Sequence, residues 1–304
     1  FEMVSGFTTT GSTILTDVEA MSRGLLFWRS FSHWVGGMGV LVFAMAVLPM
    51  TDGRAMHLMR AEVPGPTVGK ISSKLQDSAK ILYEIYFVLT VVEVIILCLG
   101  GMPLYDALIH SFGTAGTGGF SNKALSVGAY NNPFFEIVIG VFMLLFGINF
   151  NLYYFILLRH FRDVFRSEEL RVYLGIVAFA TITITINIAS LYDNVGTALR
   201  MAFFQVASVM TTTGYATTDF NLWPNYARTV LVLLIFIGAC AGSTAGGLKV
   251  SRIIIFFKAA KQDLNRMVHS HAITTVRFEG KPLDEKTLRG VHNYFNIYML
   301  IFSA

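Results

Sequence analysis

Residues 5–15 are SGFTTTGSTIL and residues 208–216 are SVMTTTGYA. The sequence Thr-Thr-Thr-Gly thus occurs twice, each time beside an apolar stretch. A related stretch, TAGTGG, occupies residues 114–119. When the three are aligned on the Thr-Gly pair, the pivot threonines are Thr10, Thr117 and Thr213, at intervals of 107 and 96 residues. Recurrence of a motif at such intervals indicates a repeated structural unit.

The composition is that of a membrane protein. Of the 304 residues, 54% are hydrophobic and 14% are charged, and the mean hydropathy is +0.59. A helix that crosses the hydrocarbon core of a bilayer needs about 20 apolar residues. Apolar runs of that length lie at 31–50, 81–102, 134–158, 172–191 and 229–257, and a sixth begins at Tyr294. The sequence therefore predicts an all-α, multi-pass protein in a lipid bilayer.

The positive charge is distributed along the chain in a way that indicates topology. The pI is about 9.0, and segments 51–80, 159–171 and 249–292 hold 18 of the 23 Lys and Arg residues. By the positive-inside rule these connections are cytoplasmic. The basic balance therefore does not indicate a nucleic-acid partner. Cys98 and Cys240 lie within apolar runs with no partner spacing, and we expect them to be packing residues.

The second and third repeats share one layout of span, short helix, Thr-Gly loop and span. In the second unit the span 81–102 precedes a short helical segment, Tyr105–Phe112, and the span 134–158 follows the loop. In the third, the corresponding segments are 172–191, 196–209 and 229–257. The short segments are too short to cross a membrane, and we expect them to be re-entrant, with the Thr-Gly loops entering from the outer side. Residues 181–187, TITITIN, alternate as in a strand but lie inside a span, so helix is expected.

The residue types in these loops suit the binding of a dehydrated cation. Glycine adopts backbone dihedrals that other residues avoid, and β-branched threonine is stiff, so successive carbonyls can be held toward one axis. Rings of carbonyl oxygens replace the hydration shell of potassium in channel filters.

The motifs TTTGS, GTGGF and TTTGYATTDF, with HWVGGMG and GACAGSTAGGLKV, resemble the Trk/Ktr/HKT superfamily of potassium transporters, most closely its TrkH-type membrane subunits. The resemblance covers essentially the whole chain. It implies M1–P-loop–M2 units around a pseudo-fourfold, potassium-channel-like pore, a homodimer in a bacterial inner membrane, and a TrkA-like cytoplasmic nucleotide-binding regulatory subunit. We expect a chain truncated at both ends, with the fourth unit incomplete and its loop beyond Ala304. The expected divisions are a first unit (1–50), a linker (51–80), a second unit (81–158), a linker (159–171), a third unit (172–258), a linker (259–292) and the start of the fourth M1 (293–304).

The resemblance also implies which residues bind potassium, the transported ion. The filter residues are Thr9, Thr10, Gly11, Ser12, Gly116, Thr117, Gly118, Gly119, Thr212, Thr213, Gly214 and Tyr215. In plant relatives, Ser in place of the first-loop glycine accompanies sodium preference, so Gly11 favours potassium. No bound cofactor, catalytic residue or other metal site is expected.

A second signal is the length of the third M2. Residues 226–258 would form a helix of about 50 Å, too long for about 30 Å of hydrocarbon. Either this is a tilted helix with a GxxxG packing face, or it is interrupted by a loop under the filter. The TrkH-like resemblance favours the second reading and a gating role. The gate residues are Gly238, Gly242, Ser243, Thr244, Ala245, Gly246 and Gly247.

The favoured function is potassium uptake through a selective, gated, channel-like pore. The alternative is a sodium- or proton-coupled cation symporter with a site at the membrane midplane. An enzyme is not expected, because the sequence has no HExxH, GxSxG or close Cys/His set. Among other polar residues, Glu93 lies inside a span and is either functional or a structural, paired group. Asn149 and Asn151 are expected to face the inner vestibule or bond a neighbouring helix, and Lys249 and Arg252 to lie at the cytoplasmic mouth or contact a regulator. His33 and His110 are expected to pack beside the pore elements.

Overall fold

The computed structural model describes residues 1–39, 75–269 and 275–303, and the side chains of residues 75–79 and 266 are not described. The described α-helices are α1 (Glu2–Phe7), α2 (Arg23–Gly37), α5 (Leu75–Leu99), α6 (Leu104–Ala115), α7 (Pro133–Phe146), α8 (Phe150–Leu157), α9 (Phe161–Arg166), α10 (Glu168–Ile188), α11 (Val195–Met210), α12 (Asn225–Ile237), α13 (Val250–Val268) and α14 (Glu285–Ser303). The 3₁₀ turns are η1 (Ser126–Tyr130), η2 (Ala189–Leu191) and η3 (Phe220–Leu222), and a small hairpin joins β1 (Arg277–Phe278) to β2 (Lys281–Pro282). The all-α prediction is confirmed.

Two described helices are long and apolar enough to cross a membrane, within Lys80–Leu99 and Glu168–Leu191. Phe179 and Ile186 on α10 are 66% and 74% exposed, as expected for side chains that face lipid. Two threonines of α10 bond back to their own helix, since Thr183 Oγ1 donates to the carbonyl of Phe179 at 2.9 Å and Thr185 Oγ1 to that of Thr181 at 2.7 Å. The alternating segment is therefore helical, as predicted.

The predicted span 134–158 is not one helix. It consists of α7 and α8, which are bent by 91° at a short break. Gly147 caps the C-terminal end of α7, and the side chain of Asn149 caps α8 by accepting from the amide of Asn151 at 2.9 Å. A glycine C-cap followed by an asparagine N-cap is a helix stop and start signal. The predicted span 134–158 is therefore a bent pair of helices.

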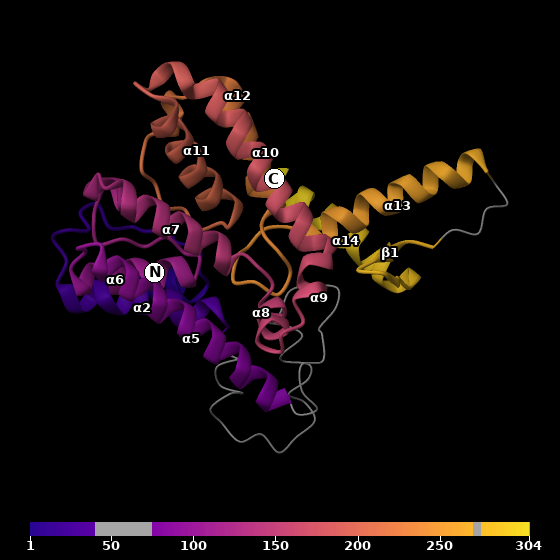
Figure 1. Ribbon diagram of the computed structural model, residues 1–304, viewed down its shortest axis with the longest axis horizontal. Coiled ribbons are helices and arrows are strands. Elements are labelled where there is room, and N and C mark those ends of the chain that lie inside the picture. Colours follow the sequence, from indigo (N-terminus) through magenta and orange to yellow (C-terminus); the bar gives the residue numbers. More distant parts are fainter. Residues whose placement is uncertain (40–74, 270–274, 304) are drawn as a thin grey trace.

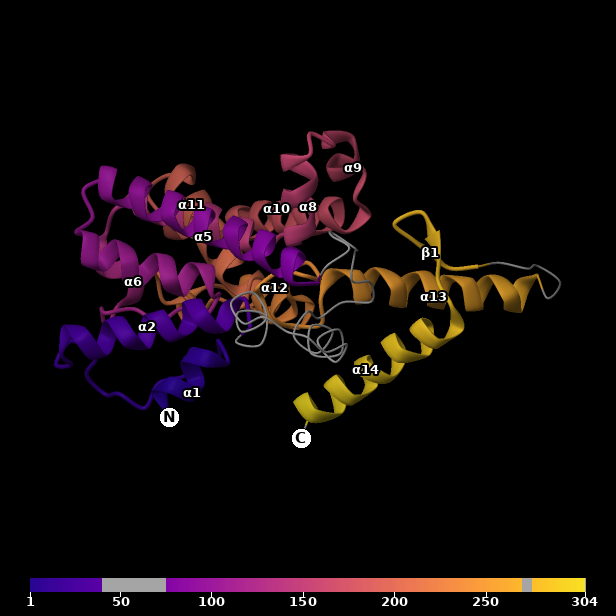
Figure 2. The same ribbon diagram turned by 90° about the horizontal axis from the view of Figure 1, so that it is seen from below.

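The short helices α6 and α11 lie on either side of α7 (Figure 1). The first packs against α2, α5 and α7, and the second packs against α7, α10 and α12. Figure 2 shows α1, α2 and α6 on the same side of the body. Buried residues of the two repeats meet between α7 and α11, where Phe204 and Met143 are fully covered. The short helix α11 thus connects the second repeat to the third.

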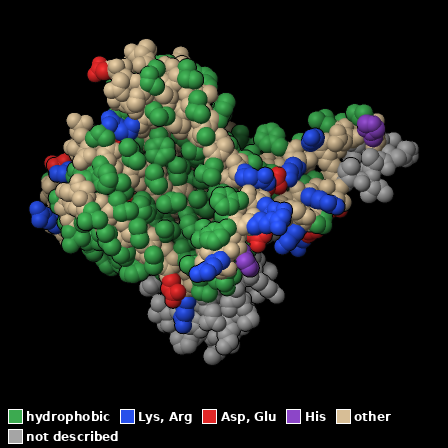
Figure 3. All heavy atoms as spheres, in the orientation of Figure 1, with side chains coloured by type: hydrophobic (Ala, Val, Ile, Leu, Met, Phe, Trp, Pro, Cys, Tyr) green, Lys and Arg blue, Asp and Glu red, His purple; other side chains and the backbone are tan. Residues whose placement is uncertain are grey.

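The described C-terminal part extends from this body as an arm. Figure 2 shows α13 projecting outward and α14 running back beneath it. In Figure 3 hydrophobic side chains cover much of the body, whereas Lys and Arg gather on the arm. The expected linker 259–292 is in part regular structure, because α13 continues to Val268 and α14 begins at Glu285.

Some expected boundaries differ or lie outside the described residues. The first M2 begins at Arg23 in α2, earlier than the predicted 31. Its predicted end at 50 and most of the linker 51–80 lie outside the described residues.

Candidate functional site: three threonine-glycine loops and an interrupted helix

The three loops that follow α1, α6 and α11 share one backbone conformation. Thr9, Thr117 and Thr212 have left-handed φ values of 52°, 51° and 57°. Two residues further on, Gly11, Gly119 and Gly214 have φ values of 74°, 74° and 85°. Left-handed φ is uncommon for a β-branched residue and marks a constrained site. We name these stretches loop 1 (residues 8–12), loop 2 (residues 116–120) and loop 3 (residues 211–215).

This pattern corrects the alignment on the Thr-Gly pair. Thr117 corresponds to Thr9 and Thr212, not to Thr10 and Thr213. The amides of the next residues donate to equivalent pore-helix carbonyls: Thr10 to Ser5 at 2.9 Å, Gly118 to Gly113 at 3.0 Å, and Thr213 to Ser208 at 2.9 Å. Loop 2 contains two adjacent glycines, Gly118 and Gly119, so the sequence alone did not show which of them is equivalent to Gly11 and Gly214. Gly119 is the equivalent residue, because it has the left-handed φ. Gly116 therefore corresponds to Thr8 and Thr211.

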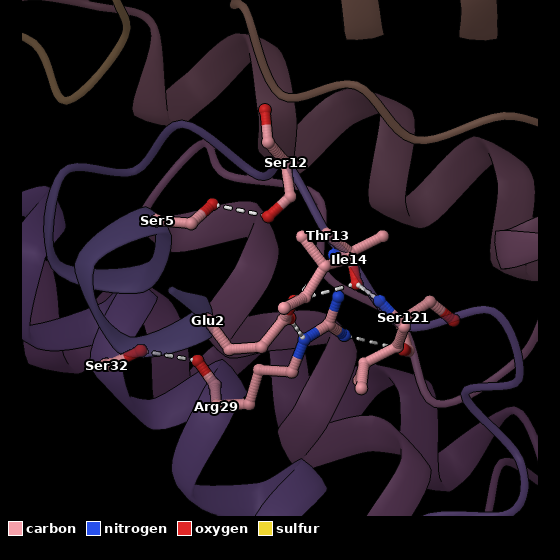
Figure 4. Close-up of polar contacts among 9 residues, drawn as sticks. Glu2, Ser5, Ser12, Thr13, Ile14, Arg29, Ser32 and Ser121 are labelled. Carbon is pink, nitrogen blue, oxygen red and sulfur yellow. Dashed lines mark hydrogen bonds and ion pairs between the residues drawn. The ribbon is translucent and has the colours of Figure 1, made fainter.

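The last carbonyl of each loop is held by a hydroxyl behind it. Ser5 Oγ donates to the carbonyl of Ser12 at 2.6 Å, and Ser208 Oγ donates to that of Tyr215 at 2.6 Å (the first pair is in Figure 4). In loop 2 the pore-helix residue is Gly113, and the hydroxyl of Tyr215 fills its place, 3.2 Å from the carbonyl of Phe120. These carbonyls therefore point to the scaffold, so Ser12 and Tyr215 hold the loops in position.

Neighbouring loops touch in the same way. A Cβ on Gly11 would lie 2.1 Å from the carbonyl oxygen of Gly118, and a Cβ on Gly119 would lie 2.1 Å from that of Thr213. Because loop 1 meets loop 2 as loop 2 meets loop 3, the three are arranged successively about one axis. Glycine is required at both contacts for space as well as for φ.

An ion pair connects the segments next to loops 1 and 2. Arg29 Nε lies 2.5 Å from Glu2 Oε2, and Arg29 also donates to the carbonyl of Ser121 at 3.3 Å (Figure 4). Glu2 Oε1 accepts from the amide of Ile14 at 2.9 Å. A charged network satisfied in this way holds its loops rigidly.

The two histidines pack beside the loops, as expected. His33 stacks on Phe120 with 3.9 Å between ring centroids. His110 lies 2.8 Å from the carbonyl of Asp106 and 3.0 Å from Ser121 Oγ through its two ring nitrogens. Both rings are fully buried. Glu93 is also fully buried inside α5.

The third M2 is interrupted, as the length argument predicted. The helix α12 ends at Ile237 and α13 begins at Val250, and we name residues 238–249 the interruption loop. Gly238, Gly242 and Gly247 have left-handed φ values of 71°, 70° and 81°. A Cβ on Gly247 would lie 2.6 Å from the Cα of Gly238, so the two ends of the loop meet closely. The continuous helix with a GxxxG face is therefore excluded.

The interruption loop contacts loops 2 and 3 through equivalent threonines. Thr117 Oγ1 donates to the carbonyl of Thr244 at 3.0 Å. The amide of Gly246 donates to Thr212 Oγ1 at 2.7 Å. The loop therefore lies directly against the pore-helix ends of loops 2 and 3.

The bend between α7 and α8 receives the other side of the interruption loop. The amide of Cys240 donates to the carbonyl of Gly147 at 3.0 Å, and the amide of Phe150 donates to the carbonyl of Gly242 at 3.0 Å. The two interrupted M2 segments thus satisfy each other's backbone groups, which lipid could not do. Asn149 caps α8 at this contact, with its side chain near Gly242.

Two charged residues hold the interruption loop and were not among the predicted gate residues. Lys249 is 2% exposed and its Nζ donates to the carbonyl of Ala245 within the loop. Glu169, at the start of α10, is 5% exposed, and its Oε1 accepts from the amides of Ala241 at 2.7 Å and Ser251 at 3.0 Å. The sequence signal for Glu169 was a second acidic residue after the cap Ser167, entering an apolar span.

Comparison with known proteins agrees with this geometry. A model of the TrkH family, described as cation transport protein, matches residues 1–192 and 176–304. The Salmonella typhimurium protein named Trk system potassium uptake protein TrkH is 39% identical over 99% of this chain and 63% of its own length. The Escherichia coli protein named Trk system potassium uptake protein TrkG is 37% identical over 99% of this chain and 62% of its own length.

A solved structure is similar throughout the chain. The crystal structure of the potassium transporter TrkH from Vibrio parahaemolyticus superposes with a TM-score of 0.85 at 31% identity, covering 99% of this chain and 62% of that one. The chain thus spans less than two thirds of the length of these relatives. The family model, the curated relatives and the solved structure all agree, and the chain belongs to the TrkH family of cation transport proteins.

Proposed function

We propose that this chain contributes to a protein that takes up potassium ions across a membrane through a selective, gated, channel-like pore. The observation that carries the proposal is the repeated loop geometry. Three loops with the same strained backbone meet in the same way about one axis. The names of the relatives, which are potassium uptake proteins, support potassium as the transported ion. No catalytic step and no bound cofactor are needed for this activity.

The ion-binding atoms in this proposal are main-chain oxygens. The carbonyls of Ser12 and Tyr215 are engaged by hydroxyls of the scaffold. Loop positions 9–11, 117–119 and 212–214 therefore supply the oxygens that replace water around potassium. Gly116 precedes this stretch in loop 2, and its role is to end the pore helix.

The interruption loop is proposed to be the gate. It bonds to the side of the filter loops where Thr117 and Thr212 lie. A segment in this position obstructs ions by occupying their path, and its glycines can absorb the dihedral changes of opening. The proposed gate consists of the predicted residues Gly238 to Gly247, with Lys249 closing the loop on Ala245.

The partners proposed for this chain are a second copy of itself and a regulatory subunit. Relatives carry the name Trk system, which supports an assembly of several components. The charged arm of α13 and α14 provides a surface on which a TrkA-like nucleotide-binding subunit can dock (Figure 3). By the positive-inside rule we assign this arm to the cytoplasmic side of the membrane. The resemblance to bacterial Trk proteins supports a bacterial inner membrane as the location of the full-length protein.

The test of the proposed function is cation flux into liposomes that contain the purified full-length protein. We expect labelled rubidium, a potassium analogue, to enter down its own gradient without an imposed sodium or proton gradient. Sodium should enter more slowly. A flux that requires a sodium or proton gradient would instead favour the coupled symporter, and no cation flux would refute the proposal.

A further inference from the structure

The carboxylate of Glu169 bonds to both sides of the junction between the interruption loop and α13. A single oxygen, Oε1, accepts from the amide of Ala241 within the loop and from the amide of Ser251 in the first turn of α13. The second amide is one of the free donors at a helix N-terminus, where negative charge is favoured. This contact fixes the loop relative to the helix that follows it.

Movement of the interruption loop away from the filter requires this contact to break. A buried carboxylate without its donors is costly, and so are two buried amides without an acceptor. The contact therefore favours the observed position of the loop over any other. In the part of the chain that the structure describes, the hydrogen bonds of the Glu169 carboxylate go to the interruption loop and α13, so it acts on ion flow through the loop.

A second carboxylate connects Glu169 to the hairpin of the arm. Glu279 lies in the turn between β1 and β2 and has a left-handed φ of 49°. Its Oε1 accepts from Ser167 Oγ at 2.9 Å and from the amide of Glu169 at 3.0 Å. The hairpin thus caps the N-terminus of α10, the turn that carries Glu169.

The hairpin is also fixed to α13. Lys258 on α13 lies 2.5 Å from Glu168 Oε1 and donates to the carbonyl of Arg277 at 2.9 Å. Beside these contacts is a cavity of about 720 Å³, whose lining includes Glu169, Ala241 and Glu279. The cavity provides space into which the hairpin carboxylate can withdraw. Hydrogen bonds therefore connect the hairpin, the N-terminus of α10, the interruption loop and the filter in sequence.

We propose that Glu169 is a positioning residue that holds the interruption loop against the filter, and that Glu279 places this contact under the control of the β1–β2 hairpin. A partner that displaces the hairpin removes the cap from α10, weakens the hold of Glu169 and frees the loop. This inference rests on the proposed gating role of the loop. A partner can act in this way only by binding the displaced hairpin more tightly than the docked one.

The experiment measures rubidium flux into liposomes holding the full-length protein without a regulatory subunit. Glu169→Ala should raise flux about tenfold, the factor that corresponds to loss of one charge-assisted hydrogen bond. Glu169→Gln keeps an oxygen acceptor and should raise flux less. Glu279→Gln, on the exposed hairpin, should raise flux about threefold and remains testable if the Glu169 variants fail to fold. Asp193→Asn, an exposed carboxylate between η2 and α11 and outside this cavity, is the matched control and should leave flux unchanged.

A second experiment separates the proposed hold of Glu169 on the interruption loop from a general loss of structure. In a protein lacking Ala241–Ala245, Glu169→Ala should add no further flux, because the loop it holds has been shortened. The preference for rubidium over sodium should stay as in the unaltered protein. If shortening the loop raises flux but neither Glu169→Ala nor Glu279→Gln does, the positioning role of Glu169 and Glu279 is refuted. The proposed gating role of the interruption loop is then retained. If the unaltered and shortened proteins both carry no cation, the proposed function has failed instead.

Discussion

Removal of Ala241–Ala245 is expected to raise potassium flux at least about tenfold in the absence of a regulatory subunit. The deletion removes the carbonyls of Gly242 and Thr244, which accept from Phe150 and Thr117. It also removes the amide of Ala241, one of the two amides that donate to Glu169. Each such bond stabilises the obstructing position by about 1 kcal/mol, and about 1.4 kcal/mol corresponds to a tenfold change in population. Liposome flux of labelled rubidium measures the effect.

The ion preference should not change in the same variant. The loops are bonded to the helices that precede them: the amide of Gly118 donates to the carbonyl of Gly113, and Ser208 Oγ donates to the carbonyl of Tyr215. The deletion removes neither hydrogen bond. Thr244→Ala is the control, because it keeps the loop length and the carbonyl that Thr117 contacts and loses only the 3.3 Å bond from Thr244 Oγ1 to the carbonyl of Phe146. Flux in the deletion variant no higher than in this control would show that the interruption loop only packs the fold.

Gly11→Ala is expected to lower the preference for potassium over sodium about tenfold. Its Cβ would lie 2.1 Å from the carbonyl oxygen of Gly118, whereas a carbon and a carbonyl oxygen normally lie about 3.3 Å apart or more. Loop 2 must therefore move by roughly 1 Å, which displaces the oxygens that substitute for water around the ion. The left-handed φ of 74° adds strain for any residue with a Cβ.

The matched control for this prediction is Gly101→Ala. Gly101 also has a left-handed φ, 94°, but a Cβ there meets nothing within 4 Å. The control thus carries the strain without the collision and should keep the ratio of rubidium to sodium flux. An unchanged ratio in Gly11→Ala would remove this glycine from the selectivity mechanism.

The sequence predicted those parts of the site that depend on local chemistry. Repeated Thr-Gly motifs identified all three loops, and an apolar segment too long for the bilayer identified the interruption. The register of loop 2 was wrong because Gly118 and Gly119 are both permissive. The folded backbone decides between them, since Gly119 has the left-handed φ and contacts Thr213. Local pattern could not make that choice.

The contacts that hold the interruption loop could not be predicted, because they join distant parts of the chain. Glu169 lies 72 residues from Ala241 in sequence, and it stood among charged residues assigned to a linker. The bend at Gly147 was signalled by a glycine and an asparagine close together, yet the continuous apolar character of 134–158 hid it. Its reason is the interruption loop itself, whose backbone groups need partners from a second broken helix.

The central claim is that the three loops bind potassium along one axis. Anomalous diffraction from crystals of the full-length protein soaked in rubidium tests it most directly. The account predicts rubidium density beside the carbonyl oxygens of loop positions 9–11, 117–119 and 212–214, at about 3 Å as for a dehydrated cation. Rubidium bound elsewhere in the protein, with these carbonyls unoccupied, would contradict it.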